Sequence, residues 1–251
     1  MLDLQKASMW KRISAWLFDL ILLGILVVGA ALLLSTVLGY DTHAAALEEL
    51  YAGYEQSYGV KLNVTAEERA AFDAAQEAAY LAAREAMYTD VTWQQLYGLL
   101  IQYTVLITVF AILIAYLLLE LLVPLLLGNG QTLGKKVFGI GVMRIDGVRL
   151  SAPLLFARTV LGKYTVETMI PVMILLMISL NPSYAVWLSL VGILVLVELA
   201  LLIFTPARTP LHDKLAQTVT VDLASQMIFE TYDELLVYRK KYNESKESGQ
   251  L

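Results

Sequence analysis

Four carboxylates stand in or beside long apolar stretches of this 251-residue chain. Asp19, Glu120 and Glu198 interrupt three such stretches, and Glu167 stands at the start of another. Ionisable groups inside a bilayer are costly, and those that occur usually relay protons, bind ions or form buried pairs. The four acids are therefore the candidate site of the chain, for a proton, a cation or another ligand.

Pro124 adds a second feature to this candidate site. Proline has no N–H to donate to the carbonyl four residues earlier, which is the carbonyl of Glu120. A carbonyl oxygen beside carboxylates in a low-dielectric setting could bind a hard cation, and the carboxylates could hold a proton. The structural alternative pairs each acid with an arginine or a hydroxyl on a neighbouring helix. Its candidate partners are Arg12 for Asp19, and the hydroxyls of Thr104, Thr165 and Ser189.

Composition indicates which class of protein positions these acids. Hydrophobic residues make up 58% of the chain and charged residues 16%, whereas a soluble domain has about 45–50% and about 25%. We therefore expect an all-α integral membrane protein in a lipid bilayer. A net charge of −5 excludes general nucleic-acid binding, and the absence of cysteine excludes disulfides and thiolate metal sites.

Four stretches are predicted transmembrane helices: residues 16–38, 97–127, 166–180 and 184–204. The segment between the first two, residues 40–96, contains ten acidic and three basic residues, whereas basic residues flank the opposite ends of the helices. Because Lys and Arg are enriched in cytoplasmic flanks, we expect both termini in the cytoplasm and the acidic segment outside. The predicted location is a cell membrane.

The inserted segment 40–96 predicts an extracytoplasmic helical hairpin. Apolar and aromatic residues recur at helical spacing over 43–58, and Gly59 suits the end of a helix. Thr65 and Glu68 form a capping-box pattern that opens a second helix, and Asp90 could cap the next one. We expect the two apolar stripes to pack on each other. The functional alternative is a docking surface for an extracellular partner or ligand.

The segments predicted to be cytoplasmic contain no recognisable phosphate-binding motif. The glycines before Lys135 have the wrong spacing for a P-loop or a dinucleotide fingerprint. Residues 142–150 instead predict a β-hairpin turning at Asp146–Gly147, which could pair with 218–222 to give a small cytoplasmic β element. Residues 152–165 are a candidate amphipathic helix at the inner interface. A second amphipathic helix is expected in the tail, residues 223–251.

Three blocks of the sequence resemble the RDD family, small polytopic proteins of bacterial membranes named for one arginine and two aspartates. The blocks are KRISAWLFD at 11–19, GQTLGKKVFGIGV at 130–142 with its Asp146–Gly147 end, and LHDKLAQTV at 211–219. The resemblance implies an RDD-like membrane domain over 10–222, with Arg12, Asp19 and Asp213 at the name-giving positions. Gln217 stands where the family usually has glycine, so the local turn is expected to differ. For some members the family implies ion or small-solute transport, including sodium–proton exchange, and for others partnership with membrane proteins.

Two functional hypotheses follow. The first is transport of a cation, proton or small solute past the carboxylates in the inner half of the helix bundle. A four-helix bundle is narrow, so this hypothesis favours a homo-oligomer. The second is a non-enzymatic adaptor that scaffolds or regulates a partner membrane protein through the outside hairpin. No nucleophile–base pair or zinc-protease motif predicts an enzyme, and we expect no catalytic residue, cofactor or metal. His212 beside Asp213 is not enough for a metal site, because the only other histidine is predicted to lie across the membrane.

Overall fold

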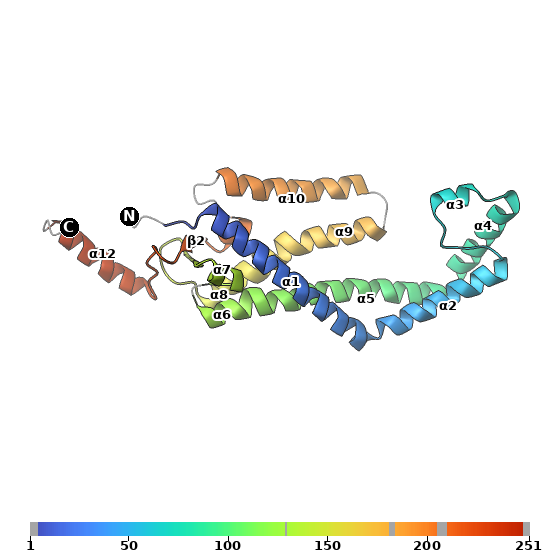
Figure 1. Ribbon diagram of the computed structural model, residues 1–251, viewed down its shortest axis with the longest axis horizontal. Helices are drawn as coiled ribbons and strands as arrows, with labels where there is room; N and C mark the ends of the chain where they lie inside the picture. Colours follow the sequence, from blue (N-terminus) through green and yellow to red (C-terminus); the bar gives the residue numbers. More distant parts are fainter. Residues whose placement is uncertain (1–4, 129, 181–183, 205–209, 248–251) are drawn as a thin grey trace. The chain divides into compact units, whose positions relative to one another are not determined.

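The computed structural model describes residues 5–128, 130–180, 184–204 and 210–247, and helices dominate it (Figure 1). This confirms the all-α membrane class that composition predicted. The chain divides into two compact units. Unit 1 holds the described residues up to Val28 and from Ile112 onward, and unit 2 holds Gly29–Ala111. The candidate site lies in unit 1.

Three helical stretches are long and apolar enough to cross a membrane: Met9–Leu38, Val91–Leu127 and Ala152–Ile178. The first is α1. The second joins α5 (Val91–Tyr116), the π-helix η1 (Leu117–Leu122) and α6 (Val123–Leu127). The third joins α8 (Ala152–Phe156), the π-helix η2 (Ala157–Met169) and most of α9 (Ile170–Leu180). The predicted span 184–204 corresponds to α10 (Tyr184–Phe204), which packs against α9 (Figure 1). Only Val191–Leu201 of α10 counts as an apolar helix among the described residues, so four spans remain a prediction.

The third span differs from the sequence-based expectation. The helix begins at Ala152 instead of 166, so residues 152–165 are not a separate interfacial helix. Ser151 occupies the N-cap position, and proline in the first turn is compatible with a helix start. The charges that suggested an interfacial position, Arg158 and Lys163, form ion pairs inside unit 1. Because partners compensate those charges, the helix can continue through them.

A two-stranded antiparallel sheet forms from β1 (Ile140–Arg144) and β2 (Thr218–Asp222), which confirms the predicted pairing. Each strand follows a five-residue helix, α7 (Leu133–Val137) before β1 and α11 (Leu211–Leu215) before β2. The turn after β1 differs from the expected one. Gly147 donates to the carbonyl of Arg144 and has φ of +96°, so Ile145 and Asp146 occupy the centre of the turn.

Unit 2 contains the helical hairpin that the sequence predicted. Helix α2 (Tyr40–Tyr58) ends at Gly59 in the left-handed conformation, and its apolar stripe packs against α4 (Ala74–Thr89). The predicted second helix is interrupted, because the capping box at Thr65 opens only the short α3 (Ala66–Ala70). Asp73 then caps α4 in a second capping box. The buried core of unit 2 consists of Val60, Leu62, Tyr80, Ala83, Met87 and Trp93.

A side-chain hydrogen bond ties the last turns of α2 to the residue that follows α4. The hydroxyl of Tyr54 donates to the carboxylate of Asp90 at 2.5 Å, which raises the pKa of Tyr54 to about 12. Asp90 also accepts the backbone N–H of Thr92 at 2.7 Å, as expected of a residue that caps the next helix. The apolar stripes of the two hairpin helices therefore pack against each other inside unit 2, as predicted.

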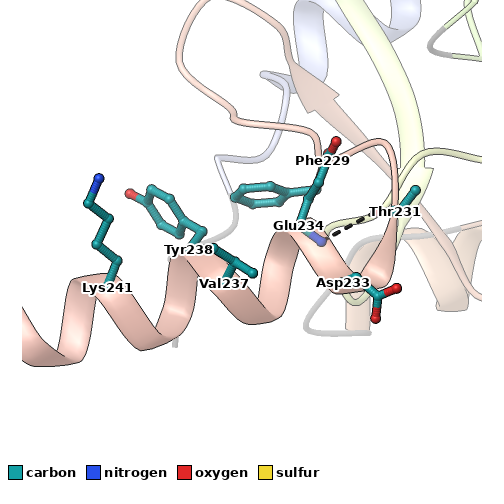
Figure 2. A pocket seen from close by; sticks show the side chains of 7 residues that line it. All are labelled: Phe229, Thr231, Asp233, Glu234, Val237, Tyr238 and Lys241. Carbon is teal, nitrogen blue, oxygen red and sulfur yellow. Dashed lines mark hydrogen bonds between the residues drawn. The ribbon is translucent and has the colours of Figure 1, made fainter.

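The tail helix α12 (Tyr232–Glu247) is anchored at its beginning. Leu235 is fully buried against Phe229 and Val148, which attaches α12 to the turn that follows β1. A hollow of about 540 Å³ lies over these first turns, where the rings of Phe229 and Tyr238 lie side by side (Figure 2). Thr231 accepts the backbone N–H of Glu234 there, as a helix cap does. The hollow therefore reflects helix capping and aromatic packing.

Candidate functional site

Unit 1 contains a connected group of ionisable side chains, which we call the charged cluster. Its acids come from α1, η1, η2, α10 and α11. Contacts hold Glu167, Glu198 and Asp213 at α11, Glu120 pairs with η2, and Asp19 bonds to the start of α7. Its basic groups come from α7, η2 and α11. The members are Asp19, Glu120, Lys135, Arg158, Lys163, Glu167, Glu198, His212 and Asp213.

Glu120 is paired twice. Its carboxylate accepts a hydrogen bond from Lys163 at 2.6 Å, and only 6% of the residue is exposed. Its backbone carbonyl, which Pro124 cannot serve, accepts the hydroxyl of Thr159 at 2.9 Å. The helix is π-helical at this point. The N–H of Val123 bonds to the carbonyl of Leu118, five residues earlier, instead of the one four residues earlier. The carbonyl therefore takes a donor from another helix.

Arg158 and Asp213 form the most deeply buried ion pair. Their side chains are 2% and 1% exposed, and the guanidinium Nε lies 2.6 Å from the carboxylate. Thr218 donates a further hydrogen bond to the same carboxylate oxygen at 2.8 Å. Burial alone would raise the pKa of Asp213, but the Arg158 guanidinium outweighs burial and holds it well below its usual range. Asp213 is therefore ionised and fixed.

Two carboxylates meet the start of α11. Glu167 accepts the backbone N–H of His212 at 2.8 Å, and both its oxygens lie 2.8 Å from the His212 Nδ1. Glu198 accepts the backbone N–H of Leu211 at 3.2 Å through one oxygen. Its other oxygen is buried with no N–H donor among the described residues, and the Glu198 carboxyl group lies within hydrogen-bond reach of the Glu167 carboxyl group. Burial, reinforced by Arg158, lowers the pKa of His212, so the imidazole is neutral at pH 7 and donates from Nδ1.

Asp19 holds the start of α7. Its carboxylate accepts the hydroxyl of Thr132 at 2.5 Å and the backbone N–H of Gly134 at 2.7 Å. The sequence suggested Arg12 as the partner of Asp19 and did not predict these two donors. The approach is possible because residue 134 is glycine, since a Cβ there would collide with the carbonyl of Ala15 and with Asp19 itself. Asp19 therefore positions the helix that carries Lys135.

Lys135 is the unusual member of the charged cluster. It is 8% exposed, and its ammonium forms no ion pair or hydrogen bond within the described parts of the chain. Burial lowers its pKa to about 7; Lys163 and Arg158 add to this lowering, while Glu120 and Asp19 oppose it. A lysine of this kind changes its charge near neutral pH.

A second glycine brings η2 against α11. At Gly162 an added Cβ would lie 2.6 Å from the Cβ of His212, so only glycine permits this contact. The close approach places Arg158 and Glu167, on the same helix, within reach of α11. Among the described residues no three His, Cys, Asp or Glu side chains are arranged to hold a metal ion. What the charged cluster offers chemically is proton exchange between acids, a lysine and a histidine.

Sequence reasoning identified the acids but missed most of their partners. Two of the hydroxyls proposed as partners bond within their own helices, Thr104 to the carbonyl of Leu100 and Thr165 to that of Val160. The side chain of Ser189, the third, lies outside the described residues. The hydroxyls that serve the cluster are those of Thr132, Thr159 and Thr218. Two glycines, Gly134 and Gly162, mark in the sequence the points where the helices of the cluster approach each other closely.

Comparisons with known proteins agree with the three sequence blocks. No curated protein and no solved structure matches the chain. The model of the RDD family matches residues 6–217, which covers α1, the charged cluster and α11. The chain therefore belongs to the RDD family.

Proposed function

We propose that this protein is a membrane transporter that moves protons, alone or coupled to a cation or small solute, through the charged cluster. The proposal includes the topology expected from the basic flanks, with both termini in the cytoplasm and α2–α4 outside. We also propose that the protein is not an enzyme, because the described residues of the cluster include acids, bases and hydroxyls but no activated nucleophile.

One observation carries the proposal: Lys135 is buried without a partner among the described residues, and the carboxyl groups of Glu167 and Glu198 lie against each other. A purely structural network would satisfy its members, because an unpaired buried polar group costs about 1–3 kcal/mol and a charged one more. Lys135 does not meet this condition among the described residues, and the contact between the carboxyl groups of Glu167 and Glu198 meets it only when one of them holds a proton. Ion pairing accounts for Glu120 and Asp213, and it does not account for Lys135 or for the contact between the carboxyl groups of Glu167 and Glu198.

Electrostatic interactions and hydrogen bonds link Lys135 to the carboxyl groups of Glu167 and Glu198 through the rest of the cluster. Lys135 interacts electrostatically with Asp19 and Glu120. Glu120 pairs with Lys163, whose charge reaches Glu167. Glu167 bonds to His212, and its carboxyl group lies against that of Glu198. A proton can pass along such a path by short exchanges between groups whose partners fix their positions.

Proton flux in proteoliposomes tests the proposal directly. The purified protein is reconstituted with a pH-sensitive dye inside the vesicles, and flux is recorded under a pH gradient with sodium or potassium outside. We expect flux above that of protein-free vesicles, and its loss in Glu120→Gln and Asp19→Asn. Glu198→Gln is the most conservative test, because the amide oxygen can still accept the N–H of Leu211.

Glu85→Gln is the matched control, since Glu85 is exposed on α4 in unit 2. Each variant is checked for a single gel-filtration peak before flux is measured. Vesicles with wild-type protein that conduct no better than empty ones would overturn the proposal. So would folded Glu120→Gln, Asp19→Asn and Glu198→Gln proteins that all retain wild-type flux.

The adaptor hypothesis remains a prediction with less support. It relied on the apolar stripes of the hairpin as a docking surface, and these stripes pack on each other in unit 2. Deleting residues 43–88 and comparing the proteins that co-purify with the full chain would test it. A specific partner lost on deletion would favour the adaptor role over transport.

A further inference from the structure

Helix α7 has an outer face that differs in character from its inner face. Lys135 faces the charged cluster, whereas Leu133, Lys136 and Val137 are exposed, Val137 by 66%. This exposed face borders α1, where Phe18 and Leu22 lie against it. The five residues line a groove of about 440 Å³. Four of them are apolar, and Lys136 is the one charged residue of the groove.

An exposed tryptophan of α1 indicates the level in a bilayer at which the groove is expected to lie. Trp16 of α1 is 56% exposed, and exposed tryptophans of membrane helices concentrate at the headgroup level. Phe18 and Leu22 follow Trp16 by two and six residues, about 3 Å and about 9 Å further along the helix axis. The apolar wall of α1 therefore runs from the interface into the hydrocarbon layer.

We propose that this groove binds an anionic phospholipid. An acyl chain lies along Phe18, Leu22 and Val137, and the phosphate contacts the ammonium of Lys136. Charge complementarity selects this occupant: Lys136 has no ion pair within the described residues, so its charge is available to a headgroup. The apolar lining excludes a free phosphate ion as occupant, because the lining offers an ion no second polar contact. The site is independent of ion transport and would exist if the proposed function were wrong.

Native mass spectrometry of the purified full chain tests this site. The probes are dioleoyl phosphatidylglycerol, which is anionic, and dioleoyl phosphatidylcholine, which has the same chains and no net charge. We expect the wild-type protein to retain phosphatidylglycerol about fivefold better, the ratio that one near-surface lysine supplies. Lys136→Gln should bring the two lipids to equal retention while leaving the protein folded, because Lys136 is exposed.

Two further variants separate the charge from the groove. Val137→Trp fills the apolar wall and should reduce retention of both lipids. Lys214→Gln removes an exposed lysine of α11 outside the groove and should keep the wild-type preference. Equal retention of the two lipids by the wild-type protein would overturn the proposal. A preference that survives in Lys136→Gln, or is lost equally in Lys214→Gln, would overturn it as well.

Discussion

The hydroxyl of Thr159 donates a hydrogen bond to the backbone carbonyl oxygen of Glu120 at 2.9 Å, joining two helices inside unit 1. That carbonyl is the one from which Pro124 withholds the α-helical donor. The two groups are 39 residues apart in the chain. In a helix surrounded by lipid no water can replace a missing donor, so a second helix must supply it.

Replacing Thr159 by valine should therefore destabilise the protein. Valine has nearly the shape of threonine and no hydroxyl, so the Thr159→Val change isolates the hydrogen bond. We expect the free energy of unfolding to fall by about 1–3 kcal/mol, the cost of an unsatisfied buried group. Unfolding in detergent, followed by circular dichroism, measures the change. Thr165→Val is the control, because that hydroxyl is exposed and bonds within its own helix. Equal losses in both variants would contradict the assignment.

The buried pair of Arg158 and Asp213 makes a prediction about unpaired charge. Arg158→Met leaves the Asp213 carboxylate buried without its counter-charge, although Thr218 still donates to it, and should cost about 3–5 kcal/mol of unfolding free energy. Asp213→Leu should cost a similar amount for the same reason. The double variant removes both charges and should recover most of the loss, because the desolvation penalty disappears with them.

A surface pair provides the contrast for that double-mutant cycle. Arg149 and Glu230 are 2.7 Å apart but exposed, so water solvates either charge when its partner is removed. Arg149→Gln should change stability little, and the cycle with Glu230→Gln should show almost no coupling. If the double variant of Arg158 and Asp213 were as unstable as the two single variants combined, their ion pair would not be the source of the effect.

The sequence predicted those features that depend on local patterns. The membrane class, the capping box at Thr65, the helix end at Gly59 and the pairing of 218–222 with the hairpin strand all follow from residue types at short spacing. It also identified the four acids, since charge in an apolar stretch is visible in one dimension. The partners of those acids depend on which helix faces contact each other. Lys163 and Thr132 lie far from Glu120 and Asp19 in the chain, so spacing alone carried no information about them.

Lys135 predicts a specific dependence of stability on pH. Its pKa is about 7 in the folded protein, whereas an ordinary lysine has a pKa of 10.5. Between these values the unfolded chain binds more protons than the folded one, so the free energy of unfolding rises with pH over this window. Below about pH 7 both states are protonated and the contribution no longer changes. The gain is at most about 1.4 kcal/mol for each pH unit.

Lys135→Met removes this dependence. From pH 7 to pH 9 the melting temperature of the wild-type protein should rise relative to that of the Lys135→Met variant. At pH 6 the variant should have the higher melting temperature. Lys136→Met, on the exposed face of the same helix, should follow the wild-type profile. Parallel profiles for the wild-type protein and Lys135→Met would show that the lysine does not titrate in this range.

Gln217 predicts a stabilising substitution. The residue has φ of 51°, and among the described non-glycine residues it alone has positive φ. The turn before β2 thus keeps the left-handed conformation that suits the family's usual glycine, although a side chain is present. A non-glycine residue in this conformation costs on the order of 1 kcal/mol, and glycine adopts it without that strain. Gln217→Gly should therefore raise the melting temperature, whereas Gln217→Ala should not, because alanine keeps the Cβ that causes the strain. Equal melting temperatures for the glycine and alanine variants would place the strain elsewhere in the turn.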